Sequence, residues 1–305
     1  MAFSPFSEGN EDRTPPEVYA IRSNGSGPNT PGWSVRVVPN KFPVLGIEGD
    51  VDIHSEPLEW MDGVGVHEVV IEHPDAMLDL ADLSSEQVGL VFDACRARLR
   101  DLVRDRRLRY LLTFKNHGIE AGSTIPHSHT QIIGLPVTPS TIRLELNASR
   151  KHFEKTGRCL FCDRMKDEVA GGERVVTENS DFVAFTPYAS RFPFEVTVAP
   201  KSHHHDFAAI ENDGLASFGE VVGDVLRRLK SALKDPPYNF ALHTAPNVES
   251  EPRPDKHWET LEKDFHWHLE IIPRLTQIAG FEWGTGFYVN SMPPESAAAF
   301  LRDAT

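Results

Sequence analysis

Two histidines and a glutamine alternate along one otherwise apolar stretch of the chain, "IPHSHTQIIGLP" (125–136). Side chains two positions apart on a β-strand point to the same side, so His127, His129 and Gln131 are expected to face one spot. A lone histidine on a strand is more often structural than catalytic. The spacing of this pair and the residues around it favour chemistry.

The residues before this strand indicate what the imidazoles would meet. The segment "NHGIEAGSTIPHSH" (116–129) contains small and hydroxyl residues, among them Gly122, Ser123 and Thr124. Such a loop lets backbone N–H groups and hydroxyls approach a phosphate closely. An imidazole, with a free pKa of about 6.5, can attack phosphorus or protonate a leaving group. The amide of Gln131 can donate an N–H to a phosphoryl oxygen as charge builds up.

A second histidine pair, His266 and His268 in "DFHWHLEIIPRL", has the same spacing. Leucine and glutamate follow it in place of the Thr-Gln of the first pair, so His268 is not expected to be a second nucleophile. Two of the three cysteines, Cys159 and Cys162 in "GRCLFCDRM", have C-x-x-C spacing. Three cysteines are too few for a disulfide framework, and in a reducing compartment this spacing indicates metal or redox chemistry.

The bulk composition bounds the class of protein. The 305 residues are 40% apolar and 25% charged, which is typical of a soluble globular protein. No apolar run approaches the roughly 18 residues that span a bilayer. The N-terminus also lacks a secretory signal pattern, so a cytoplasmic protein without a membrane partner is expected. The net charge of −14 argues against a general nucleic-acid binder, although a pocket of opposite local charge can still take a small anion.

The two halves of the chain contain the same motifs in the same order. Each begins with a short turn, here called a knuckle ("SPFS" at 4–7 and "CLFC" at 159–162), and continues with strands, a helix and a strand that carries the H-x-H pair. Apolar periodicity predicts helices near 84–106 and 212–234, and alternation in "RYLLTF" and "FEVTVAP" predicts strands. The proline-rich "LPVTPSTI" (135–142) is expected to bridge the halves. The predicted fold is α+β and internally duplicated, with halves at 1–142 and 143–305, each an antiparallel sheet with flanking helices.

Five ordered motifs resemble one family. The motifs "VVPNKFPVL", "NHGIEAGSTIPHSHTQ", "CLFC", "PKSH" and "FHWHLEIIPRLTQIAGFEWGTGFYVN" are together similar to the galactose-1-phosphate uridylyltransferase family. That family is a branch of the histidine-triad (HIT) superfamily, which also includes plant-type ADP-glucose phosphorylases. The resemblance implies two HIT-like halves, a homodimer, and a nucleotidyltransferase with ping-pong kinetics acting on a nucleotide-sugar and a sugar phosphate.

The resemblance also implies roles for single residues. His129 matches the nucleophile, and its Nδ1 can be pinned by a backbone carbonyl so that Nε2 is free to attack. Gln131 would hold the transferring phosphoryl group. The residues expected to contact substrate are Asn40 at the base, Asn116, Ser123 and Thr124 at phosphate, and Glu282 in the C-terminal loop.

The C-terminal loop, "GFEWGTGFYVNSMPPE" (280–295), can be interpreted in two ways. The resemblance implies that it reaches the sugar-phosphate pocket, of its own or of the neighbouring subunit. Alternatively, Trp283, Phe287 and Tyr288 pack a tight turn. At the other end of the chain, the arginine-rich segment that usually precedes the first knuckle in the family has no counterpart before Ser4. Other basic residues, or a different substrate, are therefore expected.

One structural zinc ion is expected, in the second half. Tetrahedral zinc takes four nitrogen or sulfur ligands, and the resemblance implies Cys159, Cys162, His203 and His266. His205 is a weaker alternative to His203, and a reduced knuckle without metal is the alternative to the whole site.

The first half is expected to hold no zinc. Ser4 and Ser7 stand where the family often has cysteines, and Ala76 stands where a histidine ligand would be. Serine hydroxyls are poor zinc ligands beside thiolates. His127 would then be held by hydrogen bonds and the two serines would tie the knuckle, with His73 as a possible substitute ligand.

The predicted function is transfer of a nucleoside monophosphate between a nucleotide-sugar and a sugar-1-phosphate or phosphate through His129. UDP-glucose with galactose-1-phosphate is the expected pair, and an adenylyl-transferring nucleotide-sugar phosphorylase is the first alternative. A HIT-type nucleotide hydrolase and a non-catalytic nucleotide-binding scaffold are the others. The sequence does not separate uracil from adenine.

Overall fold

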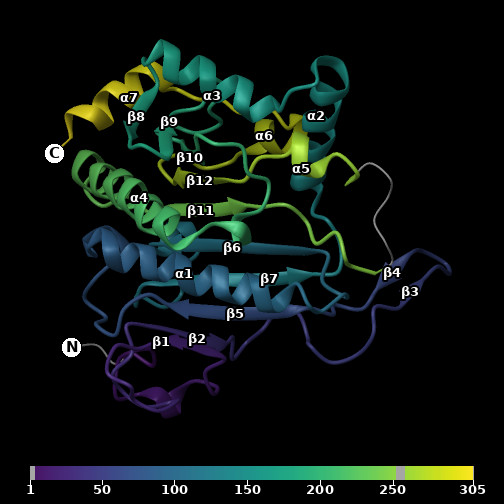
Figure 1. The fold of residues 1–305 in the computed structure, drawn as a ribbon, viewed down its shortest axis with the longest axis vertical. Coiled ribbons are helices and arrows are strands. Elements are labelled where there is room, and N and C mark those ends of the chain that lie inside the picture. Colours follow the sequence, from purple (N-terminus) through teal and green to yellow (C-terminus); the bar gives the residue numbers. More distant parts are fainter. Residues whose placement is uncertain (1–3, 252–257, 305) are drawn as a thin grey trace.

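One ten-stranded sheet runs through the whole molecule (Figure 1). The computed structural model describes residues 4–251 and 258–304. The strand order is β1-β2-β5-β7-β6-β11-β12-β10-β9-β8, and all neighbouring strands are antiparallel. In chain order the strands are β1 (Tyr19–Ile21), β2 (Val35–Pro39), β5 (Val66–Ile71), β6 (Tyr110–His117), β7 (His129–Leu135), β8 (Val175–Glu178), β9 (Phe182–Phe185), β10 (Val196–Pro200), β11 (Tyr238–His243) and β12 (His268–Pro273).

The sheet is internally duplicated. In the order of the sheet, the first five strands (β1, β2, β5, β7 and β6) come from the first half of the chain. The other five (β11, β12, β10, β9 and β8) come from the second half, and the halves join where β6 pairs with β11. In each half the strand that follows the H-x-H pair is flanked in the same way, β7 by β5 and β6, and β12 by β10 and β11. The expected α+β fold with antiparallel halves is confirmed, and the two half-sheets form one continuous sheet. The boundary between residues 142 and 143 stays a prediction.

Two long helices, α1 (Ser85–Leu102) and α4 (Asn212–Leu233), lie side by side over one face of the sheet (Figure 1). None of the helices in the described ranges is both long and apolar enough to cross a membrane. The remaining helices are α2 (Ser140–Thr156), α3 (Leu160–Gly171), α5 (Leu261–Asp264), α6 (Gly280–Thr285) and α7 (Pro294–Asp303), with 3-10 turns η1 (Glu11–Arg13), η2 (Leu80–Asp82), η3 (Ile119–Ala121) and η4 (Phe207–Ala209).

The helix boundaries follow local capping. The Ser84 hydroxyl accepts a hydrogen bond from the Gln87 backbone N–H at 3.2 Å, which starts α1 where the sequence predicts a helix. The predicted range 84–106 extends past the observed end at Leu102. Helix α4 begins and ends within one residue of its predicted range.

Glycines set the contact between α1 and α4. Gly89 on α1 meets Gly219 on α4, and a Cβ on Gly219 would lie 2.6 Å from the Ser85 carbonyl oxygen. Since neither position carries a side chain, the two helices approach closely. The fully buried rings of Phe92 and Phe218 then pack edge to face, with centroids 4.8 Å apart, between the helices and the sheet.

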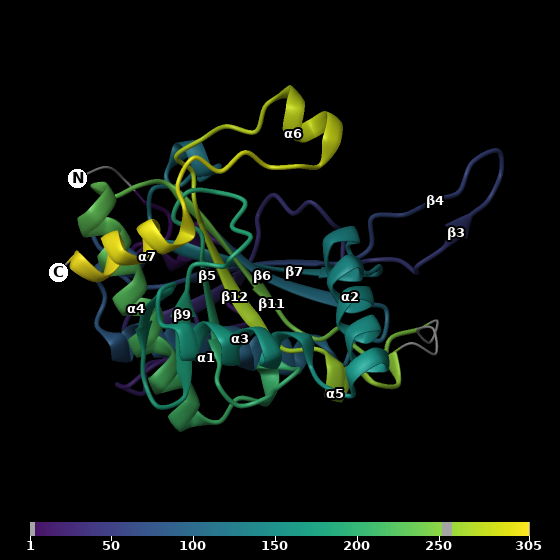
Figure 2. The same cartoon turned by 90° about the horizontal axis from the view of Figure 1, so that it is seen from above.

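Two segments project from this body (Figure 2). One contains the short hairpin of β3 (Ile53–His54) and β4 (Trp60–Met61), and the other contains α6. The predicted tight turn packed by the aromatics of the C-terminal loop is wrong, because Trp283 is 79% exposed and Phe287 is 70% exposed. The first part of the loop forms α6, and of the three rings Tyr288 alone packs on another ring in the described part of the chain, edge to face on Phe192 with centroids 5.3 Å apart.

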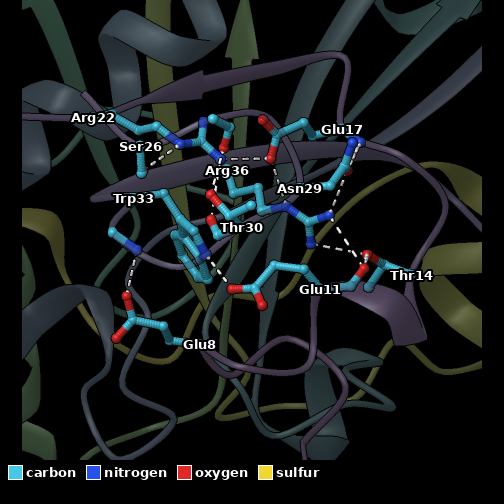
Figure 3. Close-up of polar contacts among 12 residues, drawn as sticks. Glu8, Glu11, Thr14, Glu17, Arg22, Ser26, Asn29, Thr30, Trp33 and Arg36 are labelled. Atoms are coloured by element: carbon cyan, nitrogen blue, oxygen red, sulfur yellow. Dashed lines mark hydrogen bonds and ion pairs between the residues drawn. The ribbon is translucent and has the colours of Figure 1, made fainter. Parts of the chain in front are cut away.

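A buried polar network fastens the N-terminal segment to β2 (Figure 3). Arg36 on β2 is 1% exposed, and its guanidinium donates to Glu17 Oε2 at 2.9 Å and to Thr14 Oγ1 at 2.8 Å. Trp33 Nε1 donates to Glu11 Oε1 at 2.8 Å. These groups satisfy one another, so the segment packs firmly on the sheet and brings the first knuckle next to the H-x-H strand.

Candidate functional site

His129 begins β7 and is 7% exposed. Its Nδ1 lies 2.8 Å from the carbonyl oxygen of His127. A carbonyl oxygen can only accept, so Nδ1 carries the proton and Nε2 carries a lone pair, as the sequence predicts. Burial lowers the pKa of His129, and the nearby Lys115 ammonium lowers it further. The ring is therefore neutral near pH 7, and Nε2 is available as a nucleophile.

A cavity of about 380 Å³ opens beside His129. Asn116, Ser123 and Thr124 line it, so the structure brings together the residues predicted to contact phosphate. Asn116 Oδ1 accepts a hydrogen bond from Asn239 Nδ2 at 2.8 Å, which leaves the Asn116 amide N–H groups as donors. These donors and hydroxyls suit a phosphate group.

The loop over this cavity depends on glycine. Gly118 and Gly122 adopt positive φ angles of +82° and +93°, a backbone region that favours glycine. The cavity lining also carries acidic groups: Asp79, His117 and Asp235 offer ligand atoms within 4.8 Å of one another, and Glu120 lies on the loop itself. An anion is therefore expected beside the hydroxyl and amide donors of the lining, away from these carboxylates.

A smaller, mostly apolar pocket of about 220 Å³ lies on the other side of the first knuckle. Its lining includes Phe6, Val38, Asn40 and Phe42. Phe6 separates this pocket from the nucleophile, since its ring also packs edge to face on His129 with centroids 5.5 Å apart. A mostly apolar pocket of this kind can take a flat heterocycle, and the base contact predicted for Asn40 stays a prediction.

Gln131 is held by a residue that sequence reasoning missed. Its Oε1 lies 2.8 Å from His67 Nε2, and Asn40 Nδ2 lies 3.0 Å from the same nitrogen. His67 is 8% exposed and sits on β5, beside the histidine-bearing strand. In the sequence, His67 is marked only as a polar residue within the apolar strand pattern "VHEVVIEHP". Its contact with Gln131 can be inferred only when the register that pairs β5 with β7 is known.

The first knuckle is tied by a serine. Ser4 Oγ lies 2.9 Å from His127 Nδ1, and His127 Nε2 lies 2.7 Å from the His73 carbonyl oxygen. Nε2 therefore donates to that carbonyl, and Nδ1 accepts the Ser4 hydroxyl proton. Ser7 takes part through its backbone, where its N–H donates to the Ser4 carbonyl at 3.3 Å. Both ring nitrogens of His127 are thus hydrogen-bonded, in line with the prediction that hydrogen bonds hold this ring.

A buried ion pair supports β7 from the face opposite His129. Lys115 Nζ donates to Glu72 Oε2 at 2.9 Å and to the His129 carbonyl oxygen at 3.1 Å. The hydroxyls of Ser128 and Thr130 each donate to the Glu72 carboxylate at 2.6 Å. Lys115 is 1% exposed and Glu72 is fully buried. The pair therefore clamps the nucleophile's strand between its two neighbours.

Breaking this pair is expected to destabilise the protein strongly. Lys115→Met or Glu72→Gln should each lower the free energy of unfolding by about 3–5 kcal/mol, because each leaves a buried charge without its partner. The double variant should lose less than the sum of the two losses. Urea unfolding of the four proteins measures the coupling, and additive losses would contradict the ion pair's buried role.

The same ion pair determines how the stability of the protein and the reaction of His129 change with pH. Burial alone would raise the pKa of Glu72, but the Lys115 ammonium and the two hydroxyls hold it below the ordinary value of 4.5. The stability that this carboxylate contributes is present above pH 4.5 and lost as pH falls through its lower folded-state pKa. Lys115→Met should also raise the pKa of His129, so the acid limb of its reaction should move to higher pH.

In the second half, the structure gathers all four predicted zinc ligands. The donor atoms of Cys159, Cys162, His203 and His266 lie within 4.8 Å of one another. Cys162 Sγ lies 3.3 Å from His203 Nδ1 and 3.4 Å from His266 Nδ1. The knuckle is the start of a helix, since Cys159 is the N-cap of α3 and Cys162 lies in its first turn.

The outer contacts of these ligands fit a metal. The Nε2 atoms of His203 and His266 each lie 3.0 Å from a backbone carbonyl oxygen, of Glu262 and Pro200 respectively. Both Nε2 atoms therefore carry protons, and the Nδ1 lone pairs face the thiols, which is the tautomer that a metal requires. The hydrogen bond from Cys162 lowers the pKa of the Cys159 thiol, so a thiolate ligand is available.

A second cluster surrounds His268, the counterpart of His129. His268 Nδ1 lies 3.0 Å from the His266 carbonyl oxygen, repeating the geometry of the first half. Glu270 replaces the glutamine, and its donor atoms lie within 4.8 Å of those of Glu145, His243 and His268, a set that can hold a cation. Burial alone would lower the pKa of His243, but Glu145 raises it. Two carboxylates make this cluster unsuited to a phosphate.

Glu282 is not among the residues that line the cavity beside His129. It lies on the projecting helix α6, and its Oε2 accepts a hydrogen bond from the Ala279 backbone N–H at 3.0 Å. Within one chain, Glu282 is therefore apart from the other predicted substrate contacts.

Two parts of the chain match models of one family. Residues 39–139 match the N-terminal domain of galactose-1-phosphate uridyl transferase, and residues 145–287 match its C-terminal domain. The ADP-glucose phosphorylase of Arabidopsis thaliana is 32% identical, over 99% of this chain and 82% of the relative. The galactose-1-phosphate uridylyltransferase of Thermotoga maritima is 30% identical, over 81% of this chain and 76% of the relative.

A solved structure supports the same likeness. The crystal structure of an ADP-glucose phosphorylase from Arabidopsis thaliana with bound ADP-glucose is similar to this one with a TM-score of 0.85 at 30% identity. The match covers 100% of this chain and 92% of that chain.

Proposed function

The chain belongs to the galactose-1-phosphate uridylyltransferase family and is a nucleotidyltransferase, and on that premise we propose that His129 carries the nucleotidyl group between two phosphates. The observation that supports this most strongly is the neutral His129 ring, whose Nδ1 is bound to a carbonyl and whose ring borders a cavity lined by phosphate-type donors.

The reaction takes place in two half-reactions. Nε2 of His129 attacks the α-phosphorus of a nucleotide-sugar, so an N–P bond forms as the bond to the bridging oxygen breaks and the sugar-1-phosphate leaves. A phosphate oxygen of the acceptor then attacks the same phosphorus, the N–P bond breaks, and the ring returns to its neutral form. The hydrogen bond from Nδ1 to the His127 carbonyl stabilises the positive charge that the ring carries between these steps.

The surrounding residues take the roles that the family resemblance implies. Gln131 donates an N–H to the transferring phosphoryl group, and Asn116, Ser123 and Thr124 bind the neighbouring phosphate. Asn40 contacts the base in the apolar pocket beside Phe6.

We propose two candidate reactions, in order of preference. Exchange between UDP-glucose and galactose-1-phosphate is the function we propose first, since the matching family models and several relatives carry that name. Phosphorolysis of ADP-glucose is the second candidate, because the Arabidopsis relative with that activity in its name aligns with nearly the whole chain.

One zinc ion per chain is proposed at Cys159, Cys162, His203 and His266. Its role is structural, since four protein ligands close the coordination sphere and leave no position for a substrate. Free thiols are required, and all three cysteines of the chain are unpaired. A reducing compartment such as the cytoplasm fits this site.

A homodimer is proposed because it would bring Glu282 to a site. The projecting C-terminal segment exposes Phe281, Trp283, Phe287 and Val289, and apolar rings on a projecting segment are typical of a segment that is covered by a partner. In a dimer, Glu282 would contact the sugar phosphate bound by the neighbouring chain.

Incubation with labelled UDP-glucose or ADP-glucose, without acceptor, tests the function. We expect an acid-labile, base-stable adduct on the protein, formed with release of glucose-1-phosphate, and the nucleotide that forms it faster identifies the base. Steady release of free nucleoside monophosphate would instead indicate a hydrolase. Absence of an adduct from either nucleotide-sugar, at concentrations where binding is measured, would indicate a scaffold.

A further inference from the structure

His67 links two of the residues assigned to substrate. On β5 it pairs with Ile133 of β7, while Val69 pairs with Gln131, so His67 and Gln131 are diagonal neighbours on one face of the sheet. The Asn40 backbone N–H donates to the His67 carbonyl at 2.8 Å, and Asn40 Nδ2 lies 3.0 Å from Nε2 of the imidazole. A polar row therefore runs from Asn40, just after β2, through His67 on β5 to Gln131 on β7, two residues from His129.

The proton positions in this row follow from one obligatory donor. The Val44 backbone N–H lies 3.3 Å from His67 Nδ1, and a backbone N–H can only donate. Nδ1 therefore carries the lone pair, which the Asn40 amide N–H also approaches at 3.3 Å, and the proton of the neutral ring is on Nε2. Asn40 Nδ2 then does not donate to Nε2, although the two nitrogens lie 3.0 Å apart. Nε2 then donates to Gln131 Oε1, at 2.8 Å.

This bond determines which end of the Gln131 amide is free. Because Oε1 accepts the His67 proton, the NH2 group of Gln131 points away from His67 and remains available as a donor. Asn40 is fixed in a similar way, since its Oδ1 accepts the Phe42 backbone N–H at 2.9 Å. With His67 only 8% exposed, bulk water has little access to replace the imidazole as the partner of Oε1.

We infer that His67 is a positioning residue, which holds the Gln131 amide so that its N–H groups and not its carbonyl oxygen face the transferring phosphoryl group. The inference rests on the proposed function. A flipped amide would place a carbonyl oxygen against phosphoryl oxygens, where it repels the charge that develops during transfer. No direct contact between His67 and substrate is required.

The test compares His67→Phe with His67→Gln in single-turnover formation of the protein adduct from the nucleotide-sugar that the wild type uses. The phenylalanine keeps ring volume but has no donor, so the rate at saturating substrate should fall by about 10- to 100-fold. The substrate concentration at half-saturation should change less. His67→Gln, whose amide N–H can reach Oε1, should recover part of the rate.

A double variant separates positioning from a general structural effect. In a Gln131→Ala background, adding His67→Phe should lower the rate no further, because His67 acts through the Gln131 amide. The control is His152→Gln, on α2 in the second half, which should react like the wild type. Should His67→Phe not fold, His67→Asn, which is too short to reach Oε1, takes its place in both comparisons.

Three outcomes would overturn the inference. These are an unchanged rate in His67→Phe, no recovery in His67→Gln, or an equal rate loss with and without Gln131. Failure of the proposed function is distinguishable from these, because then the wild-type protein itself would form no adduct.

Discussion

Replacing His129 with glycine is expected to abolish nucleotidyl transfer while leaving the fold and the metal content unchanged. The substitution removes the atom that bonds to phosphorus in the proposed reaction. Loss of the nucleophile in enzymes that use covalent catalysis lowers turnover by about 10⁴-fold or more. Exchange of label between nucleotide-sugar and sugar phosphate measures this loss.

The expected retention of the fold has a structural basis. Among the described residues, the His129 side chain makes one hydrogen bond, through Nδ1, and one ring contact, with Phe6. Glycine in a strand interior costs roughly 1 kcal/mol, so a modest loss of thermal stability is expected. Zinc content should match the wild type. A variant that keeps more than a few per cent of wild-type exchange would contradict the role of His129.

Replacing Cys159 and Cys162 together with serine is expected to remove about one zinc ion per chain and to destabilise the second half severely. Structural zinc sites in small domains contribute on the order of 10 kcal/mol to folding. Here the ligands join the start of α3 to the segments that precede α4 and β12, so their loss should loosen several elements at once. Metal analysis and thermal unfolding measure both effects.

A matched control uses the third cysteine. Cys95 is fully buried in α1 and has no histidine or cysteine ligand group around it among the described residues. Cys95→Ala should lower stability modestly and leave zinc content unchanged. Two zinc ions per wild-type chain, or one zinc retained in the double serine variant, would contradict the assignment of the metal to this knuckle alone.

Much of the site could be predicted from the sequence because its residues follow short-range rules. Alternation on a strand predicts that His127, His129 and Gln131 share a face, and β7 confirms the strand from His129 onward. The ligands of the second knuckle come from three separate segments, and only the family resemblance joined them. The structure brings their ligand atoms within 4.8 Å of one another.

The rest depends on long-range register. His67, Glu72 and Lys115 are ordinary strand residues in the sequence, and their roles appear only when β5, β7 and β6 are placed side by side. The clamp of Glu72 and Lys115 lies on the face opposite the nucleophile, so no pattern around the H-x-H pair points to it. The sequence alone predicts a packed turn for the rings of the C-terminal segment, because it does not show that the helix there projects from the body.

The most direct test of the account is to map the nucleotidyl group on the protein. After reaction with UDP-glucose or ADP-glucose, the protein is digested at neutral to basic pH and the modified peptide is sequenced by mass spectrometry. We predict one nucleoside monophosphate per chain, attached to His129 in the peptide that contains "IPHSHTQ". Attachment to another residue, or turnover with no covalent intermediate, would contradict the account.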